Sequence, residues 1–149
     1  VVRVWGMMQD AAYWHRVVAE HPDARLDYCG FLPTDELQAE IGRCAALVMA
    51  PKWVEAFGNV AVEAMATGVP VLTYDRGGPA EIVVDGVTGF VVPADDVDAL
   101  VGAVARINQI DRVMCRQRVD AEYSSLAMAD RVLSWVDEVV DANNEVVNA

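Results

Sequence analysis

One stretch of the chain, from Pro51 to Glu81, constrains the fold more than any other. It predicts a loop, a helix from Asn59 to Thr67 that Gly68 closes, an apolar strand from Val69 to Tyr74, and a second glycine-rich turn. A continuous apolar strand between helices is typical of a parallel sheet with both faces covered. In such a sheet, ligands bind at the carboxyl ends of the strands, which is where the glycine-rich turns are expected.

The rest of the chain repeats this alternation of strands and helices. Further strands are expected at 1–6, 26–30, 45–50 and 89–92, and further helices at 10–20, 34–41, 79–84, 95–109 and 125–140. Thr34 and Asp95 are expected to cap two of these helices, because their side-chain oxygens can accept from the free N–H groups of a first turn. The pattern predicts a single doubly wound α/β domain of about five strands over 1–149, with a helical tail at 111–149.

Charge and composition exclude several classes of protein. The formal net charge of −12 leaves no excess of Lys and Arg for nucleic acid or an anionic membrane. No apolar run approaches the roughly 18 residues of a membrane span, and a hydrophobic content of 54% suffices for a buried core. Cys29, Cys44 and Cys115 lack metal or disulfide spacing, which predicts core-packed thiols in a cytoplasmic protein.

The central stretch carries two carboxylates beside the start of a helix. Glu55 and Glu63 are separated by seven residues, an offset of about 80° on one helix, so Glu55 is expected on the loop and Glu63 in the opening turns of the helix. The free N–H groups of the helix start favour phosphate, and the carboxylates can accept from neutral hydroxyls. A nucleotide sugar carries both phosphates and neutral hydroxyls. The alternative is a solvated glutamate beside an ordinary turn.

A longer motif surrounds these carboxylates. The sequence E-A-F-G-N-V-A-V-E-A-M-A-T-G-V-P-V, followed by G-G-P-A-E and D-G-V-T-G-F, resembles the donor-side signature of retaining glycosyltransferases of family 4, including their E-x7-E motif. The resemblance extends upstream through Gly30–Leu37 and downstream to the helical tail. It implies the Rossmann-like, C-terminal half of a two-domain GT-B enzyme, which transfers a sugar from a nucleoside-diphosphate sugar to an acceptor hydroxyl and needs no metal or other cofactor.

The resemblance also implies roles for individual residues. Glu55 would be the catalytic residue at the donor sugar, and Glu63 would bind the ribose hydroxyls. The positions that would border the base are Gly30, Phe31 and Pro33. Those that would offer backbone amides to the diphosphate or sugar are Phe57, Gly58 and Asn59. Lys52 would meet the phosphates or stay solvated. The residues expected to order the loop are Gly77, Gly78 and Glu81.

Some features depart from the family pattern. Ala56 stands where the family usually has glycine, which requires a backbone without positive φ. The family's G-R-x-x-x-x-K-G-like segment, whose Arg and Lys bind the diphosphate, is not found. A first strand, that basic pair and the N-terminal acceptor domain are therefore expected to be missing. A standalone module that binds nucleotide sugars without turnover is the alternative hypothesis, and an epimerase or phosphorylase of the same fold is a third.

Other candidate sites have structural explanations. The D-x-D spacing from Asp96 to Asp98 is typical of metal sites in another glycosyltransferase fold, but acids are also expected where a helix starts. His15 and His21 have no partner at triad spacing. The tail helix places apolar residues on one face, which is expected to pack, or to be exposed if the partner domain that the family resemblance implies is missing. These residues are Leu126, Ala129, Val132, Leu133 and Val136. Trp53, two residues before Glu55, is typical of family branches with an aromatic there.

Overall fold

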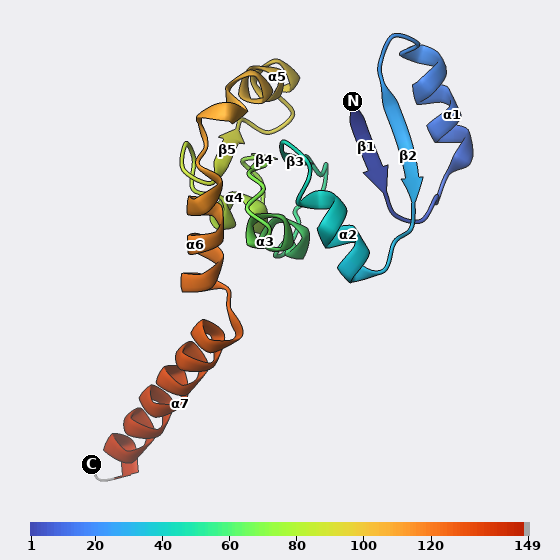
Figure 1. Ribbon diagram of the computed structural model, residues 1–149. Helices are drawn as coiled ribbons and strands as arrows, with labels where there is room; N and C mark the ends of the chain where they lie inside the picture. The colour runs from blue at the N-terminus through green and yellow to red at the C-terminus, as the bar shows by residue number, and fades with distance from the viewer. Residues whose placement is uncertain (148–149) are drawn as a thin grey trace. The chain divides into compact units, whose positions relative to one another are not determined.

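The structure is a computed structural model that describes residues 1–147 (Figure 1). It contains two compact units, Val1–Glu40 and a second that begins at Ile41. Among the residues described, no helix combines the length and apolar character needed to cross a membrane.

The first unit is built on one β–α–β crossover. Strand β1 (Val2–Trp5) pairs in parallel with β2 (Leu26–Gly30), and α1 (Ala11–Glu20) connects them (Figure 1). The cap of α1 is Asp10, whose carboxylate accepts from the backbone N–H of Tyr13 at 2.8 Å. Every residue of β1 and β2 is exposed or half-buried, so the covered faces expected of a parallel sheet are not found here.

The helix that follows β2 has the expected bounds but not the expected cap. Helix α2 (Thr34–Ile41) has Thr34 as its first helical residue, so the prediction that Thr34 precedes the helix as its cap is wrong. The N–H of Leu37 donates to the carbonyl of Pro33 at 2.9 Å. Asp35 and Glu36 lie in the first turn, where the helix dipole favours acids.

The second unit contains a three-stranded parallel sheet in the order β3-β4-β5. These strands are Leu47–Met49, Val71–Tyr74 and Gly89–Val92. Strand β4 lies in the middle and all four of its residues are buried, as its continuous apolar run predicts. The α/β class and the five parallel strands are therefore confirmed, although the strands form two sheets instead of one.

Five helices and one 3-10 turn complete the second unit. They are α3 (Asn59–Ala66), α4 (Gly78–Ile82), α5 (Val97–Arg106), η1 (Ile107–Gln109), α6 (Arg112–Glu122) and α7 (Ser125–Val147). The expected cap at Asp95 is wrong: Asp96 caps α5 by accepting from the N–H of Ala99 at 2.8 Å. Helices α6 and α7 fill the stretch expected as a helical tail, of which 148–149 lie outside the described residues.

The core of the second unit is formed by its sheet and by α3, α4, α5 and α6, each of which contributes buried residues. Its largest fully buried side chains include Met65, Leu72 and Ile82. Cys115 is also buried there, and desolvation raises the pKa of its thiol to about 11. Cys29 is exposed and Cys44 is half-buried, so core packing of the cysteines is confirmed only for Cys115.

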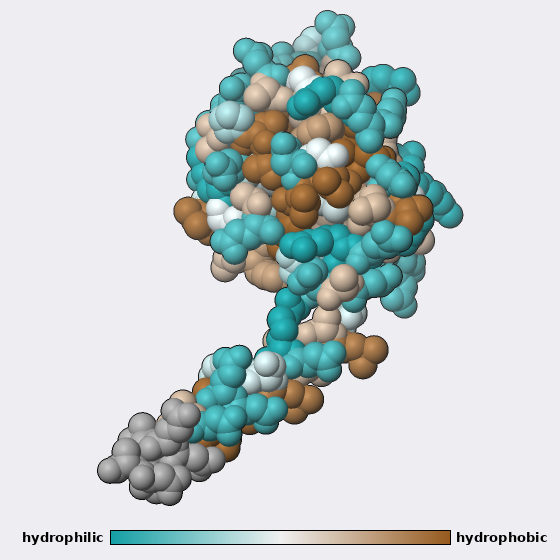
Figure 2. Space-filling view, turned by 90° about the vertical axis from the view of Figure 1, so that its left-hand side faces the viewer, coloured by the Kyte–Doolittle hydropathy of each residue, from teal (hydrophilic) through white to brown (hydrophobic). Residues whose placement is uncertain are grey.

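Helix α7 presents an apolar face to solvent. The residues expected to pack are instead exposed, among them Leu126, which is 76% exposed, and Leu133, which is 62% exposed. Figure 2 shows brown, apolar side chains at the surface of this lower, helical part. Of the two expectations for this helix, the exposed apolar face is therefore the one found in the part of α7 whose side chains the structure describes.

Candidate functional site

The loop from Pro51 to Gly58 joins β3 to α3 and rests on the glycine-rich turn after β4. The N–H of Gly78 donates to the carbonyl of Glu55 at 2.8 Å. A Cβ on Gly77 would lie 2.4 Å from the carbonyl oxygen of Glu55, and a Cβ on Gly78 would lie 2.4 Å from that of Phe57. Since no side chain tolerates such approaches to backbone, the contact between the two segments requires glycine at both positions.

The loop ends at a helix start that no side chain covers. Gly58 precedes α3 with φ +94° and makes no side-chain cap, while its carbonyl accepts from the N–H of Ala61 at 2.9 Å. Gly58 is buried, and a Cβ there would approach Pro79 Cγ to 2.9 Å. The first N–H groups of a helix have no intrahelical partner, so the start of α3, at Asn59 and Val60, combines exposed residues with the positive end of the dipole.

Two carboxylates flank this helix start along the chain. Glu55 lies on the loop and is half-buried, and its Oε2 accepts from the indole Nε1–H of Trp53 at 3.0 Å. Glu63 lies in the second turn of α3 and is also half-buried. The arrangement offers hydroxyl acceptors on both sides of a group of N–H donors.

An arginine that the sequence analysis missed braces the beginning of the loop. Arg76 Nη1 donates to the carbonyl of Pro51 at 2.9 Å, and both terminal nitrogens donate to Asp95, at 3.3 and 2.5 Å. This hydrogen bond lowers the pKa of Asp95, with a smaller contribution from the charge of Lys52, and raises the pKa of Arg76. The arginine therefore ties the loop to the segment after β5, and no local pattern in the sequence marks that partner.

We expect the Arg76–Asp95 pair to make stability depend on pH in acid. The pKa of Asp95 is lowered in the folded chain, so its stabilisation is complete above the unfolded value of about 3.9 and is lost as the pH falls through the folded value. The melting temperature of the wild type should therefore lose an increment below about pH 4 that Asp95→Asn lacks. Asp98→Asn is the matched control, and parallel pH curves for wild type and Asp95→Asn would contradict the assignment.

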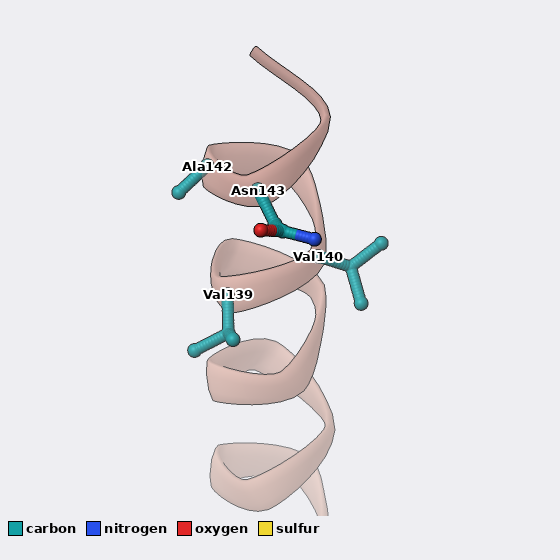
Figure 3. A pocket seen from close by; sticks show the side chains of 4 residues that line it. All are labelled: Val139, Val140, Ala142 and Asn143. Atoms are coloured by element: carbon teal, nitrogen blue, oxygen red, sulfur yellow. The ribbon is translucent and has the colours of Figure 1, made fainter. Parts of the chain in front are cut away.

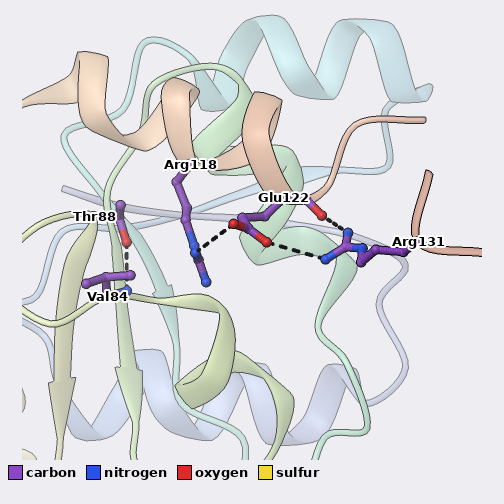
Figure 4. Close-up of polar contacts among 5 residues, drawn as sticks. All are labelled: Val84, Thr88, Arg118, Glu122 and Arg131. Carbon is purple, nitrogen blue, oxygen red and sulfur yellow. Dashed lines mark hydrogen bonds and ion pairs between the residues drawn. The ribbon is translucent and has the colours of Figure 1, made fainter. Parts of the chain in front are cut away.

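The loop also packs against the end of α6. The ring of Phe57 meets that of Tyr123 edge-on, with centroids 6.0 Å apart at 69°. The guanidinium of Arg118 lies 5.6 Å from the Tyr123 centroid and 3.7 Å from Glu122, which Arg131 of α7 contacts as well (Figure 4). This contact joins segments far apart in sequence, which is why the sequence analysis missed it.

Comparison with known proteins identifies the family. The model of the family described as Glycosyl transferases group 1 matches residues 15–121. The chain belongs to this family. A similar curated relative, the D-inositol 3-phosphate glycosyltransferase of Kribbella flavida, is 37% identical over 99 residues, which cover 59% of this chain and 23% of the relative. This group 1 glycosyltransferase chain thus spans about a quarter of that protein.

Solved structures agree with this assignment. The sucrose-phosphate synthase of Thermosynechococcus elongatus is 28% identical, with a TM-score of 0.74 over 94% of this chain and 38% of that one. The Anabaena protein HepE, solved in complex with UDP, is 19% identical with a TM-score of 0.68, over 85% and 36%. The neighbours are GT-B glycosyltransferases, which confirms the expected fold class, a Rossmann-like C-terminal half.

Not all the residues expected at the site of this glycosyltransferase chain lie on the loop. Gly30, Phe31 and Pro33 belong to the first unit: Gly30 ends β2 with φ +76°, and Phe31 and Pro33 lie between β2 and α2, where both are exposed. Glu81 is exposed on α4 and Lys52 is exposed at the start of the loop. The structure therefore brings Glu55 and Phe57 against Gly77 and Gly78, and Gly58 against Pro79, while the roles predicted for all these residues in ligand binding stay untested.

The other candidates of this chain are accounted for differently. In the D-x-D segment, Asp96 caps α5. Among the side chains that the structure describes, no three of His, Cys, Asp or Glu converge as metal ligands would. His15 and His21 are exposed. Among the described side chains, those that line a hollow on α7 all belong to that one helix, namely Val139, Val140, Ala142 and Asn143 (Figure 3). With a single wall it cannot enclose a ligand.

Proposed function

We propose that this chain is the donor-binding part of a retaining hexosyltransferase, which transfers a sugar from a nucleoside-diphosphate sugar to an acceptor hydroxyl. The observation that carries the proposal is the uncapped start of α3 between a loop carboxylate, Glu55, and a helix carboxylate, Glu63. Helix N-termini bind phosphate, and carboxylates accept from sugar and ribose hydroxyls. A nucleoside-diphosphate sugar presents these groups in the matching order.

The proposed chemistry depends on charge that develops on the leaving diphosphate. Backbone amides of Phe57, Gly58 and Asn59, together with the dipole of α3, would stabilise that charge without a metal ion. Glu55 would lie at the sugar and support the positive charge that develops at the anomeric carbon. Glu63 would hold the ribose, so that the nucleotide is fixed at both ends of the diphosphate.

Relatives support the proposed class of donor and the proposed separation of donor binding from acceptor binding. HepE, which shares the fold, was solved with UDP, and the relative from Kribbella flavida is named as a glycosyltransferase. Because the chain covers 23% of that relative, the acceptor would be held by an N-terminal domain outside this chain. The proposal also places the enzyme in the cytoplasm, the reducing compartment that cysteines without disulfide spacing favour.

A module that binds nucleotide sugars without turnover is the second candidate function. It is favoured by the engagement of Arg76, a cation beside the loop. Arg76 donates to the carbonyl of Pro51 and pairs with Asp95. Its guanidinium is therefore not free to neutralise a diphosphate fully. Measuring release of free sugar or nucleoside diphosphate from the bound donor separates a catalyst from such a module.

The test of the donor site is a calorimetric titration with UDP, GDP and ADP and with their glucose and mannose conjugates. Glu63→Ala should weaken nucleoside diphosphate and sugar conjugate alike, by about tenfold, the loss expected for one hydrogen bond to a charged group. Glu55→Ala should weaken only the sugar conjugate. Glu138→Ala, on α7, is the control. Equal losses for both ligands in both variants would contradict these roles.

A further inference from the structure

Trp53 is an aromatic residue that the packing of the loop does not explain. Its surface is 65% exposed, although tryptophan normally contributes a large buried area. Its one polar atom is nevertheless engaged, because the indole Nε1–H donates to Glu55 Oε2 at 3.0 Å. The two side chains lie two residues apart on the loop and meet across Val54.

Within residues 1–147 the indole is the partner that the structure gives to the Glu55 carboxylate, which takes part in no ion pair there. The guanidinium of Arg76, which braces the same loop at Pro51, is paired with Asp95. A hydrogen bond to a carboxylate is about twice as strong as one between neutral groups. The orientation of the carboxylate therefore depends on Trp53.

The main chain of Glu55 is fixed independently of its side chain. Its carbonyl accepts from the N–H of Gly78 at 2.8 Å, and Gly77 lies against the same peptide. Because the backbone of Glu55 is held at one end and Oε2 at the other, the side chain of Glu55 keeps little conformational freedom. Oε1, the other carboxylate oxygen, is the one left for a ligand hydroxyl.

We propose that Trp53 is a positioning residue, which holds Glu55 Oε2 so that Oε1 meets a hydroxyl of the donor sugar. The inference rests on the proposed function for the identity of the ligand, but the hydrogen bond itself does not. An ordered carboxylate loses less conformational freedom when the sugar binds, so the bond should strengthen sugar binding and leave nucleotide binding unchanged.

The hydrogen bond is tested by NMR of the indole N–H groups in the uniformly ¹⁵N-labelled 149-residue chain. The chain has four tryptophans, and Trp53→Phe assigns the resonance by its disappearance. In Glu55→Gln that resonance should move upfield, because the acceptor loses its charge, while the other indole resonances stay in place. An indole resonance of Trp53 that is unchanged in Glu55→Gln would overturn the proposal.

The positioning role is tested by calorimetry with UDP-glucose or GDP-mannose, whichever the wild type binds, and with the matching nucleoside diphosphate. Trp53→Phe keeps an aromatic ring but removes the N–H donor, so affinity for the sugar conjugate should fall about threefold to tenfold, with no change for the diphosphate. Trp135→Phe, at a comparably exposed position on α7, is the matched control. A loss shared by both ligands would show a merely structural role and overturn the proposal.

The NMR and calorimetry experiments together distinguish a failure of this inference from a failure of the proposed function. If the wild-type chain binds none of the nucleotides or their sugars, the proposed function fails, and with it the sugar-directed role of Trp53. The indole shift still decides whether Trp53 holds Glu55. If the wild type binds the donor and only the Trp53 results fail, the donor site stands and the positioning role does not.

Discussion

Replacing Gly78 with alanine is expected to displace the loop from Pro51 to Gly58 and to weaken donor binding at least about tenfold. The new Cβ would lie 2.4 Å from the carbonyl oxygen of Phe57 and 2.6 Å from that of Ala56. Both neighbours are backbone, so no side chain can rotate to make room. Overpacking of this kind costs about 1–3 kcal/mol, and here it also separates the amides expected to hold the diphosphate.

The measurement is urea unfolding of the variant together with calorimetry using the nucleotide that the wild type binds. Gly102→Ala is the matched control, because a Cβ at Gly102 in α5 meets nothing within 4 Å. Since glycine costs helix stability, this control should be neutral or stabilising by about 0.5–1 kcal/mol. Wild-type stability and affinity in Gly78→Ala would mean that the two segments do not touch in solution.

Local signals in the sequence predict the elements that depend on local physics. The bounds of β5 and the end of α3 before Gly68 follow from short-range patterns, and the structure has both. The cap of α5 shows the limit of such signals. Two adjacent aspartates can each cap, and Asp95 is taken by Arg76, a residue that no pattern near Asp95 indicates.

The candidate site likewise has features that local sequence patterns predict and features that they do not. The motif predicts Glu55 on a loop and Glu63 on a helix, because a glycine ahead of an amphipathic run marks a helix start, and both residues lie there in the structure. The tertiary contacts of the loop are not predictable in this way: Phe57 meets Tyr123, and Gly78 fits beneath Ala56 and Phe57. Such contacts depend on how distant elements pack, which a single sequence does not encode in any local period.

The exposed face of α7 is also beyond the reach of a sequence pattern. A stripe of apolar residues at helical spacing predicts a buried face but does not identify what buries it. In the described part of the chain, α7 follows α6 and keeps Leu126 and Leu133 at the surface. Comparing one buried and one exposed leucine therefore tests the packing of the second unit directly.

Leu72→Ala is expected to cost about 2–5 kcal/mol of the free energy of unfolding, because Leu72 is fully buried in β4 and its truncation leaves a cavity. That cost is a large share of the roughly 5–15 kcal/mol that stabilises a typical domain, so the urea midpoint should fall markedly. The same change at Leu126, which is 76% exposed, should alter stability by no more than about 0.5 kcal/mol. If Leu126→Ala were as costly as Leu72→Ala, the apolar face of α7 would be buried in solution, contrary to its exposure in the structure.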